Sequence, residues 1–456
     1  MGAASTVRKQ RLILGHPAGL FVLFFTEMWE RFSFYGMRAL LVLYLTQHLI
    51  QASQTGTTIY GFEGLRTGLE AVFGPLAVQP LASQIYGLYT GFVFFTPFFG
   101  GILADRVLGQ RKTVVIGGLL MAIGQFLMAF ESSFLIALLF LILGNGCFKP
   151  NISTQVGNLY KPGDPRRDRA FTIFYMGVNL GAFLSPLICG TLGQLYGWHY
   201  GFISAGIGML LGLLVYLLGQ DYLAQDQLTR DRSAQKELEP LTSKEWRAIL
   251  GLVALCALNI VFWGVYEQQG NTMQLFADKN TDWHFLGWEM PSTWFQAVNP
   301  AFIFLLTPFL NTFWTWQTKR QKEPCSVVKM AIGCFLLGLG FVFLMFVTRG
   351  LGDTQKISFL WLVACTALYT IGEIYLSPIG LSLVTKVAPG RLVGMMMGFW
   401  FMSSFFGNYL SGYLGTFYEK MPKENFFFML SVLAVISGFA IFALQRPLTK
   451  AVGKDV

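Results

Sequence analysis

The sequence predicts an all-α integral membrane protein with twelve transmembrane helices, and three observations support this fold class. First, 54% of the 456 residues are hydrophobic and only 12% are charged, whereas soluble domains average about 25% charged residues. Second, hydrophobic runs of about 20 residues, the length that crosses a hydrocarbon layer, recur twelve times. Third, 24 of the 33 Lys and Arg residues fall on one side of the alternating runs, six on the other and three within them. This bias follows the positive-inside rule and predicts that both termini are cytoplasmic.

The twelve predicted spans divide evenly around one polar segment. Their approximate centres are Leu40, Phe94, Ala122, Ile142, Gly177, Leu211, Ile260, Phe304, Gly338, Ile371, Ser403 and Val435. Residues 220–244 form the longest polar stretch and predict a cytoplasmic linker. We therefore expect a six-helix bundle at 1–219 and a second at 245–456, each built from inverted repeats of three helices. The loop at about 50–78 is long and rich in glycine, and no role is predicted for it.

The first span contains four ionisable side chains: Glu27, Glu30, Arg31 and Arg38. On a helix that turns about 100° per residue, they share one arc roughly 100° wide. Each would cost about 2.5 to 3.5 kcal/mol at the centre of a bilayer if it faced acyl chains. The first span therefore predicts a polar cavity between helices, of the kind that carries substrates or ions.

The ionisable groups within the spans are unequal in sign. The acids are Glu27, Glu30, Glu267 and Glu373, and the bases are Arg31, Arg38 and Lys149. One carboxylate lacks a cationic partner, and a proton is its natural neutraliser in a medium of low dielectric constant. The sequence therefore favours proton coupling. The six cysteines and four histidines show no metal-ligand spacing, so we expect neither a metal site nor a cofactor, and the net charge of +9 is explained by topology rather than by nucleic acid.

A loop after the second span carries a motif of known type. The segment Gly101–Lys112, with Asp105 and Arg106 at its centre, resembles the signature loop of the major facilitator superfamily. An acid at a helix end beside a cluster of bases can pair with a neighbouring helix and latch one side of a rocking transporter. The resemblance implies two six-helix bundles and a gating role for Asp105 and Arg106.

Further motifs resemble the proton-coupled oligopeptide transporter family within that superfamily. The segment Glu27–Gly36 is similar to its ExxERFxYY signature, and Phe174–Gly181 is similar to its FYxxxNxG signature. Other family segments recur in order at Lys149–Ser153, Gly197–Phe202, Phe262–Gln268, Asn299–Pro300 and Gly372–Pro378. The resemblance covers nearly the whole chain. It implies symport of di- and tripeptides with protons across the cytoplasmic (inner) membrane by a monomer.

Two departures from the family pattern concern hydroxyl groups and helix number. Phe34 stands where the signature has its first tyrosine, and Phe94 stands where relatives usually have a substrate-contacting tyrosine. Both replacements bear on hydrogen bonds to the peptide. Many bacterial members carry two additional helices between the bundles, but residues 220–244 are too few and too polar to hold them. We therefore expect twelve spans rather than fourteen.

The resemblance assigns roles in substrate binding. Arg38 and Lys149 would hold the peptide carboxylate, and Glu373 with Asn179 and Asn299 would hold the ammonium on the other side of the cavity. Side-chain pockets that tolerate many peptides would be formed by Trp263, Trp400, Tyr35, Phe34 and Phe94. Trp263 with Glu267, and Glu373 with Ser377, are four residues apart and project to one helix face.

The resemblance also assigns roles in coupling. Glu267 would pair with Arg38 when ionised and release it when protonated. Glu27, Glu30 and Arg31 would form a second switch with Lys149. Pro378 would mark a bend where a gate flexes.

Alternatives to these roles remain open. The charges of Glu30 and Arg31 can form a static clasp, and Trp263 and Trp400 can be packing residues. A transporter of the same fold for nitrate or a drug-like solute is the alternative function. A sensor or an intramembrane enzyme lacks support, because no nucleophile and base pair, metal motif or signalling domain is present, so we expect no enzymatic activity.

Overall fold

The computed structural model describes residues 11–161, 164–224, 242–352, 355–388 and 392–452. These ranges are almost entirely helical, and the strands in them are two residues long. They pair as β1 (Leu12–Ile13) with β2 (His16–Pro17), β3 (Thr281–Asp282) with β6 (Ile357–Ser358), and β4 (His284–Phe285) with β5 (Trp288–Glu289). The predicted all-α class is confirmed.

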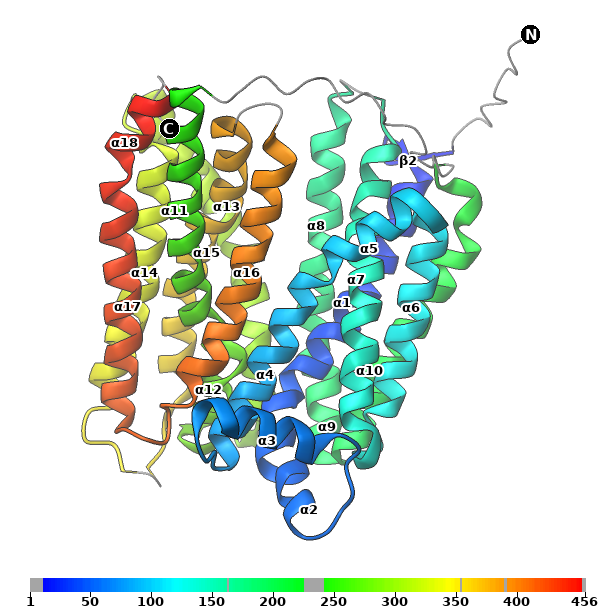
Figure 1. The fold of residues 1–456 in the computed structure, drawn as a ribbon, viewed down its shortest axis with the longest axis vertical. Helices are drawn as coiled ribbons and strands as arrows, with labels where there is room; N and C mark the ends of the chain where they lie inside the picture. Colours follow the sequence, from blue (N-terminus) through cyan, green and yellow to red (C-terminus); the bar gives the residue numbers. More distant parts are fainter. Residues whose placement is uncertain (1–10, 162–163, 225–241, 353–354, 389–391, 453–456) are drawn as a thin grey trace.

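Twelve long helical segments run roughly parallel to one axis (Figure 1). The first six are α1 (Ala18–Tyr44), α4 (Val78–Phe95) continued by α5 (Pro97–Leu103), α6 (Gln110–Leu127), α7 (Phe134–Asn158), α8 (Arg166–Ser185) and α10 (Trp198–Leu218). The last six are α11 (Ser243–Tyr266), α13 (Phe295–Lys319), α14 (Ser326–Val347), α15 (Phe359–Val387), α16 (Val393–Gly415) and α17 (Lys423–Ala443).

Shorter helices and turns connect these segments. The α-helices are α2 (Ile50–Gln54), α3 (Phe62–Phe73), α9 (Thr191–Leu195), α12 (Thr272–Lys279) and α18 (Gln445–Val452). The π-helical turns are η1 (Leu45–Leu49), η2 (Ala104–Leu108) and η4 (Pro186–Gly190). The 3₁₀ turns are η3 (Glu131–Ser133), η5 (Gln220–Tyr222), η6 (Glu267–Gly270) and η7 (Ser292–Trp294).

Nine of the helical segments within the described ranges are long and apolar enough to cross a membrane by length and composition alone. The other three long helices, α1, α6 and α16, are less apolar, and α1 is so because it carries the four ionisable side chains. All three pack against other helices: α1 against α8 and α10, α6 against α7, and α16 against α11 of its own bundle and α4 of the other. The twelve-helix arrangement agrees with the prediction.

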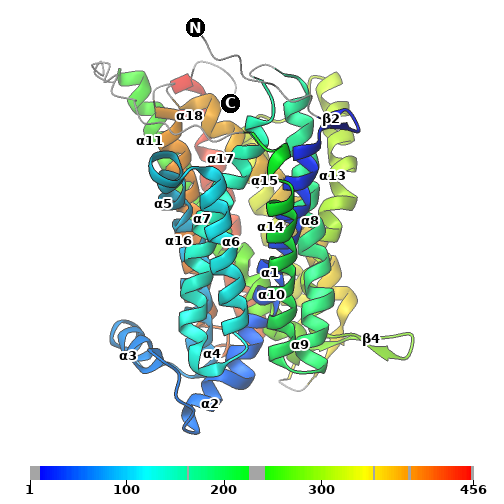
Figure 2. The same cartoon turned by 90° about the vertical axis from the view of Figure 1, so that its right-hand side faces the viewer.

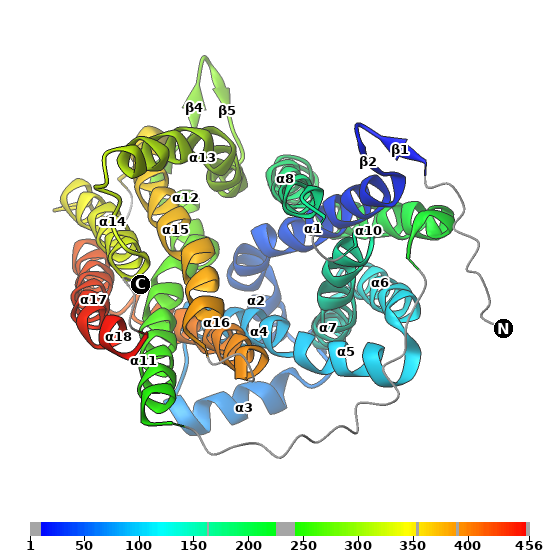
Figure 3. The same ribbon diagram turned by 90° about the horizontal axis from the view of Figure 1, so that it is seen from above.

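The helices form two groups separated along the chain. Viewed from above, α1 to α10 lie on one side and α11 to α18 on the other (Figure 3). Helix α10 ends at Leu218, just before the predicted linker at 220–244, and α11 begins at Ser243, within the last two residues of that linker. Residues 225–241 lie outside the described ranges. A capping box starts α11, because Thr242 and Glu245 exchange hydrogen bonds between side chain and backbone. The exact bundle boundaries remain predictions.

The two ends of the molecule differ, and we call them the α18 end and the α3 end (Figure 1). Helices α2 and α3 occupy the long loop at 50–78, and α3 lies crosswise beside α4 and α16 (Figures 2 and 3). Phe62 and Leu69, on one face of α3, are buried. The bundles also meet closely where α4 crosses α16, because a Cβ atom on Gly87 would lie 2.6 Å from the Cα atom of Gly412.

Candidate functional site between the two bundles

An ion pair joins the two bundles at the centre of the molecule. Arg38 of α1 contacts the carboxylate of Glu267, and its Nε atom donates to the hydroxyl of Tyr86 of α4 at 2.8 Å. Arg38 is 6% exposed and Glu267 is 4% exposed. Because a buried charge is costly unless it is paired, this contact holds both side chains in place. The sequence analysis predicted the pairing of Arg38 with Glu267.

Glu267 lies at the junction between helix α11 and a 3₁₀ turn. Helix α11 ends at Tyr266, and Glu267 begins the 3₁₀ turn η6. The Nε2 atom of Gln268 in this turn donates to the backbone oxygens of Gly264 and Ser411. The backbone N–H of Glu267 still donates to the carbonyl oxygen of Trp263. The two residues therefore lie one helical turn apart, as their spacing predicted, and the chain tightens from Glu267 onward.

Glu373 of α15 is held by uncharged groups. Its Oε2 atom accepts hydrogen bonds from the Tyr266 hydroxyl at 2.6 Å and from Asn299 Nδ2 at 3.1 Å. Asn299 of α13 also contacts the hydroxyls of Tyr266 and Thr370. Within the described ranges no Lys, Arg or His lies within ion-pair distance of Glu373. The charge count predicted one carboxylate in excess of the cations but did not say which acid it is.

The remaining charges of α1 form a local cluster. Arg31 contacts both Glu30 and Glu27, and its terminal nitrogen lies 2.7 Å from Glu30 Oε1. Asn145 of α7 reaches the same oxygen at 3.4 Å. One oxygen of Glu27 is buried and accepts no hydrogen bond from the described residues. Arg31 therefore takes both acids of this cluster in the present conformation.

Lys149 is not paired with an acid, although the sequence suggested a switch with Glu27, Glu30 and Arg31. Its amine lies 4.5 Å from the centre of the Phe94 ring, and no carboxylate in the described part of the chain lies within 4 Å of it. A cation over an aromatic face is attracted by the ring quadrupole. Lys149 therefore remains available to an anionic ligand.

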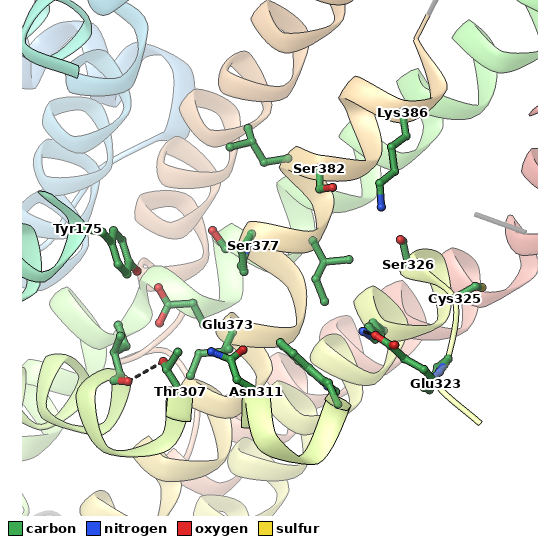
Figure 4. Close-up of a pocket in the computed structure, with 18 residues that line it drawn as sticks. Tyr175, Thr307, Asn311, Glu323, Cys325, Ser326, Glu373, Ser377, Ser382 and Lys386 are labelled. Carbon is green, nitrogen blue, oxygen red and sulfur yellow. Dashed lines mark hydrogen bonds and ion pairs between the residues drawn. The ribbon is translucent and has the colours of Figure 1, made fainter. Parts of the chain in front are cut away.

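A cavity of about 690 Å³ lies between α8, α13, α14 and α15. It is the cavity of Figure 4, in which Tyr175 of α8 faces Glu373 and Ser377 of α15. From there it continues to Glu323, Ser326 and Lys386 at the α18 end. Glu373 and Ser377 line the same cavity, as their spacing predicted.

A second cavity of about 640 Å³ lies between α4, α5, α7 and α16. Its walls are almost entirely apolar, with Lys149 as the charged group. The lining residues are Phe94, Phe95, Pro97, Phe98, Lys149, Pro150, Ser153, Met395, Gly398, Phe399, Phe401 and Met402. This cavity also lies toward the α18 end, as the first one does. A third cavity, of about 840 Å³, lies at the α3 end within the second bundle, beside Asn280 and Glu419.

The five aromatic residues predicted to line side-chain pockets are placed in different surroundings. Tyr35 and Phe34 lie beside Arg38 and Arg31, respectively, at 5.8 Å and 5.0 Å from ring centre to guanidinium carbon. Phe94 lines the apolar cavity. Trp263 packs against Phe262 and Tyr266, and Trp400 packs on Gly380 of α15. Neither tryptophan lines the two cavities described above.

Four other predicted residues occupy less specific positions. Asn179 of α8 is buried, and its side chain donates to the backbone oxygen of Tyr175 at 3.0 Å. Asp105 and Arg106 lie in the π-helical turn η2 and are exposed, and neither forms an ion pair with a described residue. Pro378 lies inside α15 and lines the first cavity. Their gating and binding roles remain predictions.

Polar contacts close the α3 end between the bundles. Asp278 of α12 accepts hydrogen bonds from Gln47 at 2.7 Å and from Gln194 of α9 at 3.3 Å. Gln194 also accepts from Thr293 of η7 at 2.9 Å, and Trp294 donates to Thr191 at 2.9 Å. Between the bundles, the conformation is thus closed at the α3 end, whereas the cavities lined by Glu373 and by Lys149 lie toward the α18 end.

One glycine makes this seal possible. A Cβ atom on Gly190 of η4 would overlap the side chain of Thr293 across the interface. We expect Gly190→Val to hold the α3 end open and to lower transport at least about fivefold, because overpacking costs about 1–3 kcal/mol. The measurement is substrate uptake together with labelling of a cysteine at position 293 from the α3 side. Thr293→Gly in the Gly190→Val background should restore uptake, and a Gly190→Val variant with normal uptake would contradict the seal.

Several residues of the site were not singled out in the sequence. The hydroxyl of Tyr86 accepts a hydrogen bond from Arg38, and the hydroxyl of Tyr266 donates one to Glu373. Asn145 contacts Glu30. Tyr86 and Tyr89 are three residues apart on the second span, a spacing that places two hydroxyl groups on one helix face. That spacing was a usable signal. In the described residues no group of three or more His, Cys, Asp or Glu side chains is arranged to hold a metal ion.

Comparison with known proteins gives the family. A family model described as "PTR2: POT family" matches residues 111–241 and 236–431. The chain is 34% identical to an uncharacterized transporter of Bacillus subtilis (strain 168), with 98% of this chain and 97% of that one covered. It is 33% identical to the peptide transporter YePEPT of Yersinia enterocolitica subsp. palearctica, with 96% of each chain covered.

Solved structures agree over the same length. The crystal structure of a peptide transporter POT in complex with sulfate has a TM-score of 0.83 and 31% identity, and the match covers 97% of each chain. A POT family transporter in complex with 5-aminolevulinic acid also has a TM-score of 0.83, at 29% identity, with 96% of this chain and 98% of that one covered. The buried cross-bundle charges, the two-bundle fold and these matches agree, and the chain belongs to the POT family of membrane transporters.

Proposed function

We propose that this protein carries di- and tripeptides together with protons across the cytoplasmic membrane by alternating access. The proposal places the α18 end in the cytoplasm, because the cationic loops lie there. The observation that carries it is the separation of charge across the bundle interface. The spans of the first bundle carry three cations, Arg31, Arg38 and Lys149, but only two acids, Glu27 and Glu30. In the second bundle, Glu373 has no cation within ion-pair distance among the described residues.

A short peptide is complementary to this layout. At neutral pH it carries an ammonium and a carboxylate at a nearly fixed separation. In the proposed complex, Arg38 and Lys149 hold the carboxylate and Glu373 holds the ammonium, with Asn299 orienting the Glu373 side chain. Because the two partners belong to different bundles, binding draws the bundles together, and charge-assisted hydrogen bonds supply the attraction. The peptide side chains contribute little to this recognition.

Proton coupling follows from competition for Arg38. In the present conformation Arg38 contacts Glu267, so a peptide carboxylate must displace this acid. A proton on Glu267 removes its charge and frees the guanidinium. Peptide binding and protonation of Glu267 are therefore linked, since each favours the state that accepts the other.

The relatives support a zwitterionic substrate. A di-/tripeptide transporter of Lactococcus lactis subsp. cremoris is 29% identical over 98% of both chains. A solved POT family transporter binds 5-aminolevulinic acid and another binds a thioalcohol conjugated peptide. 5-Aminolevulinic acid has an amine and a carboxylate at opposite ends. A ligand of this kind matches the proposed site, in which Arg38 and Lys149 hold a carboxylate and Glu373 holds an ammonium.

Counterflow in liposomes tests the substrate class. Vesicles loaded with unlabelled dialanine should accumulate labelled dialanine transiently, whereas vesicles loaded with nitrate should not accumulate labelled nitrate. Counterflow of nitrate without counterflow of dialanine would contradict the proposal and favour a transporter of the same fold for another solute.

The Glu373→Gln variant tests recognition of the ammonium group. The wild-type protein should take up dialanine far better than N-acetyl-dialanine, which lacks the ammonium. Glu373→Gln should lower the apparent affinity for dialanine at least about tenfold, because a buried charge pair is lost, and should remove the discrimination between the two compounds. Competition against labelled dialanine measures both. Glu289→Gln, at an exposed glutamate of the β4–β5 hairpin, is the control. A Glu373→Gln protein that keeps the discrimination would rule out the role.

A further inference from the structure

The cavity of Figure 4 has a second charged region, far from Glu373. At its α18 end the wall is formed by the loop between α13 and α14, by the start of α14 and by the end of α15 (Figure 4). Glu323, Lys329 and Lys386 line this mouth. Neither the sequence motifs nor the substrate clamp proposed above uses any of the three.

The charges of this mouth are held in place by local contacts. Lys329 is 7% exposed and contacts Glu323, and its amine lies 4.5 Å from the centre of the Trp314 ring. Thr318 also donates to Glu323. The hydrogen bonds from Lys329 and Thr318 keep the pKa of Glu323 below its ordinary value, so this group is an anion at neutral pH. A nearly buried lysine with a fixed partner is an ordered feature rather than a mobile surface charge.

Lys386 adds a cation that has no partner of its own. Its amine points into the mouth near Ser326 (Figure 4), and within the described ranges no carboxylate lies within 4 Å of it. Two lysines therefore face one carboxylate, and the mouth has an excess of positive charge. Glu323 lies within electrostatic range of Lys386, but its oxygens are already engaged by Lys329 and Thr318.

We propose that the mouth formed by Glu323, Lys329 and Lys386 is a second binding site, for the carboxylate of a peptide on its way between Glu373 and the α18 end. This inference rests on the proposed peptide transport. The incoming carboxylate binds Lys386 and shares Lys329 with Glu323. The site selects an anion, and the ammonium group of the peptide is not required.

Distance separates this site from the central clamp. Glu373 and Lys386 are thirteen residues apart on α15, and at about 1.5 Å per residue their backbones lie roughly 20 Å apart along the helix. A peptide extends by at most about 3.6 Å per residue. A di- or tripeptide, about 7 to 11 Å long, is therefore shorter than this backbone separation, and in the proposal it leaves Glu373 before its carboxylate binds Lys386. The mouth is a separate binding site for the same substrate.

A cysteine already present at the mouth reports on its occupancy. Cys325 lines the same cavity and is a partly exposed free thiol. The experiment measures the rate at which iodoacetamide alkylates Cys325 in the purified full chain, by peptide mapping, at increasing concentrations of N-acetyl-dialanine. Ser326→Cys supplies a second reporter at the same mouth. N-acetyl-dialanine is the probe because it has a carboxylate but no ammonium.

Variants of opposite sign make the test specific. Lys386→Gln should raise the concentration of N-acetyl-dialanine that halves the alkylation rate about 1.5- to fivefold, the range for an exposed charge pair, because Lys386 is exposed. Glu323→Gln should lower that concentration, because it removes the competing acid. Lys322→Gln, at a neighbouring lysine that does not line the cavity, should leave it unchanged.

Equal protection in the wild type, Lys386→Gln and Glu323→Gln would overturn the site, as would an effect of Lys322→Gln as large as that of Lys386→Gln. Uptake of dialanine is measured in the same preparations to separate the two proposals. Uptake without these shifts in protection would reject the mouth site alone. The expected shifts in a protein that takes up no dialanine would reject peptide transport and leave the carboxylate site in place.

Discussion

Replacing Arg38 with alanine is expected to abolish peptide uptake. The change removes the guanidinium proposed to hold the peptide carboxylate, and it leaves the nearly buried Glu267 without its cation. Truncating one partner of a buried charge pair costs about 2–5 kcal/mol, which corresponds to at least about a thirtyfold loss of binding. Uptake of labelled dialanine into proteoliposomes measures the effect.

The control for Arg38→Ala is Arg66→Ala, because Arg66 is a partly exposed arginine of α3 that pairs with Glu70. Gel filtration and thermal unfolding of both variants establish that each protein is folded. Arg38→Lys is informative as well, because a lysine keeps the charge but cannot donate to both Tyr86 and Glu267 with the geometry of a guanidinium. Near-normal uptake by a folded Arg38→Ala protein would remove the carboxylate clamp from the mechanism.

Replacing Glu267 with glutamine is expected to separate exchange from accumulation. Glutamine resembles the protonated acid in shape and has no charge, so Arg38 stays free to bind peptide in both directions. Counterflow of dialanine should continue at a rate within about threefold of wild type. Accumulation driven by an inward proton gradient should be lost, because the titrating group that links protonation to Arg38 is absent.

Glu63→Gln, at an exposed glutamate of α3, is the matched control for Glu267→Gln and should accumulate peptide normally. The two assays distinguish a coupling role from a binding role. Loss of counterflow together with accumulation would mean that Glu267 is needed to hold the site together. Gradient-driven accumulation equal to that of wild type would assign coupling to another acid, and Glu27 and Glu30 would then be tested in the same way.

Much of this architecture was predictable because membrane proteins repeat a few strong signals. The length of the apolar runs predicted the transmembrane helices. The distribution of Lys and Arg predicted which loops lie on the cytoplasmic side of the membrane. The four charges of α1 predicted a polar interior, and α1 is among the three long helices whose hydropathy alone does not mark them as spans. The ion pair between Arg38 and Glu267 followed from the family resemblance and is present in the structure.

The partners of the charges were harder to predict. Tyr86 and Tyr266 are aromatic residues within apolar runs, and many tyrosines of this kind only fill space. Their hydroxyls become informative when a buried charge lies beside them, which requires knowledge of the helix packing. The position of Lys149 over Phe94 is a similar case, because a phenylalanine in a hydrophobic helix carries no signal for a cation. The change from α-helix to a 3₁₀ turn that begins at Glu267 was not predicted either.

Conformation was the other feature that the sequence did not predict. One sequence encodes at least two arrangements of its bundles in an alternating-access transporter, and periodicity describes helices rather than their relative positions. The hydrogen bonds between Gln194 and Thr293 and between Gln47 and Asp278 belong to a state that is closed at the α3 end. Lys149 and the exposed Asp105 can acquire partners in another state without any change in the helices.

Uptake of labelled dialanine into proteoliposomes, with and without an imposed inward proton gradient, tests the central claim most directly. If one proton enters with each neutral zwitterion, a membrane potential of 100 mV contributes about 2.3 kcal/mol, which corresponds to roughly fiftyfold accumulation. We expect dialanine to rise well above its external concentration with the gradient and only to equilibrate without it. Uptake that is identical in the two conditions would contradict proton-coupled transport by this protein.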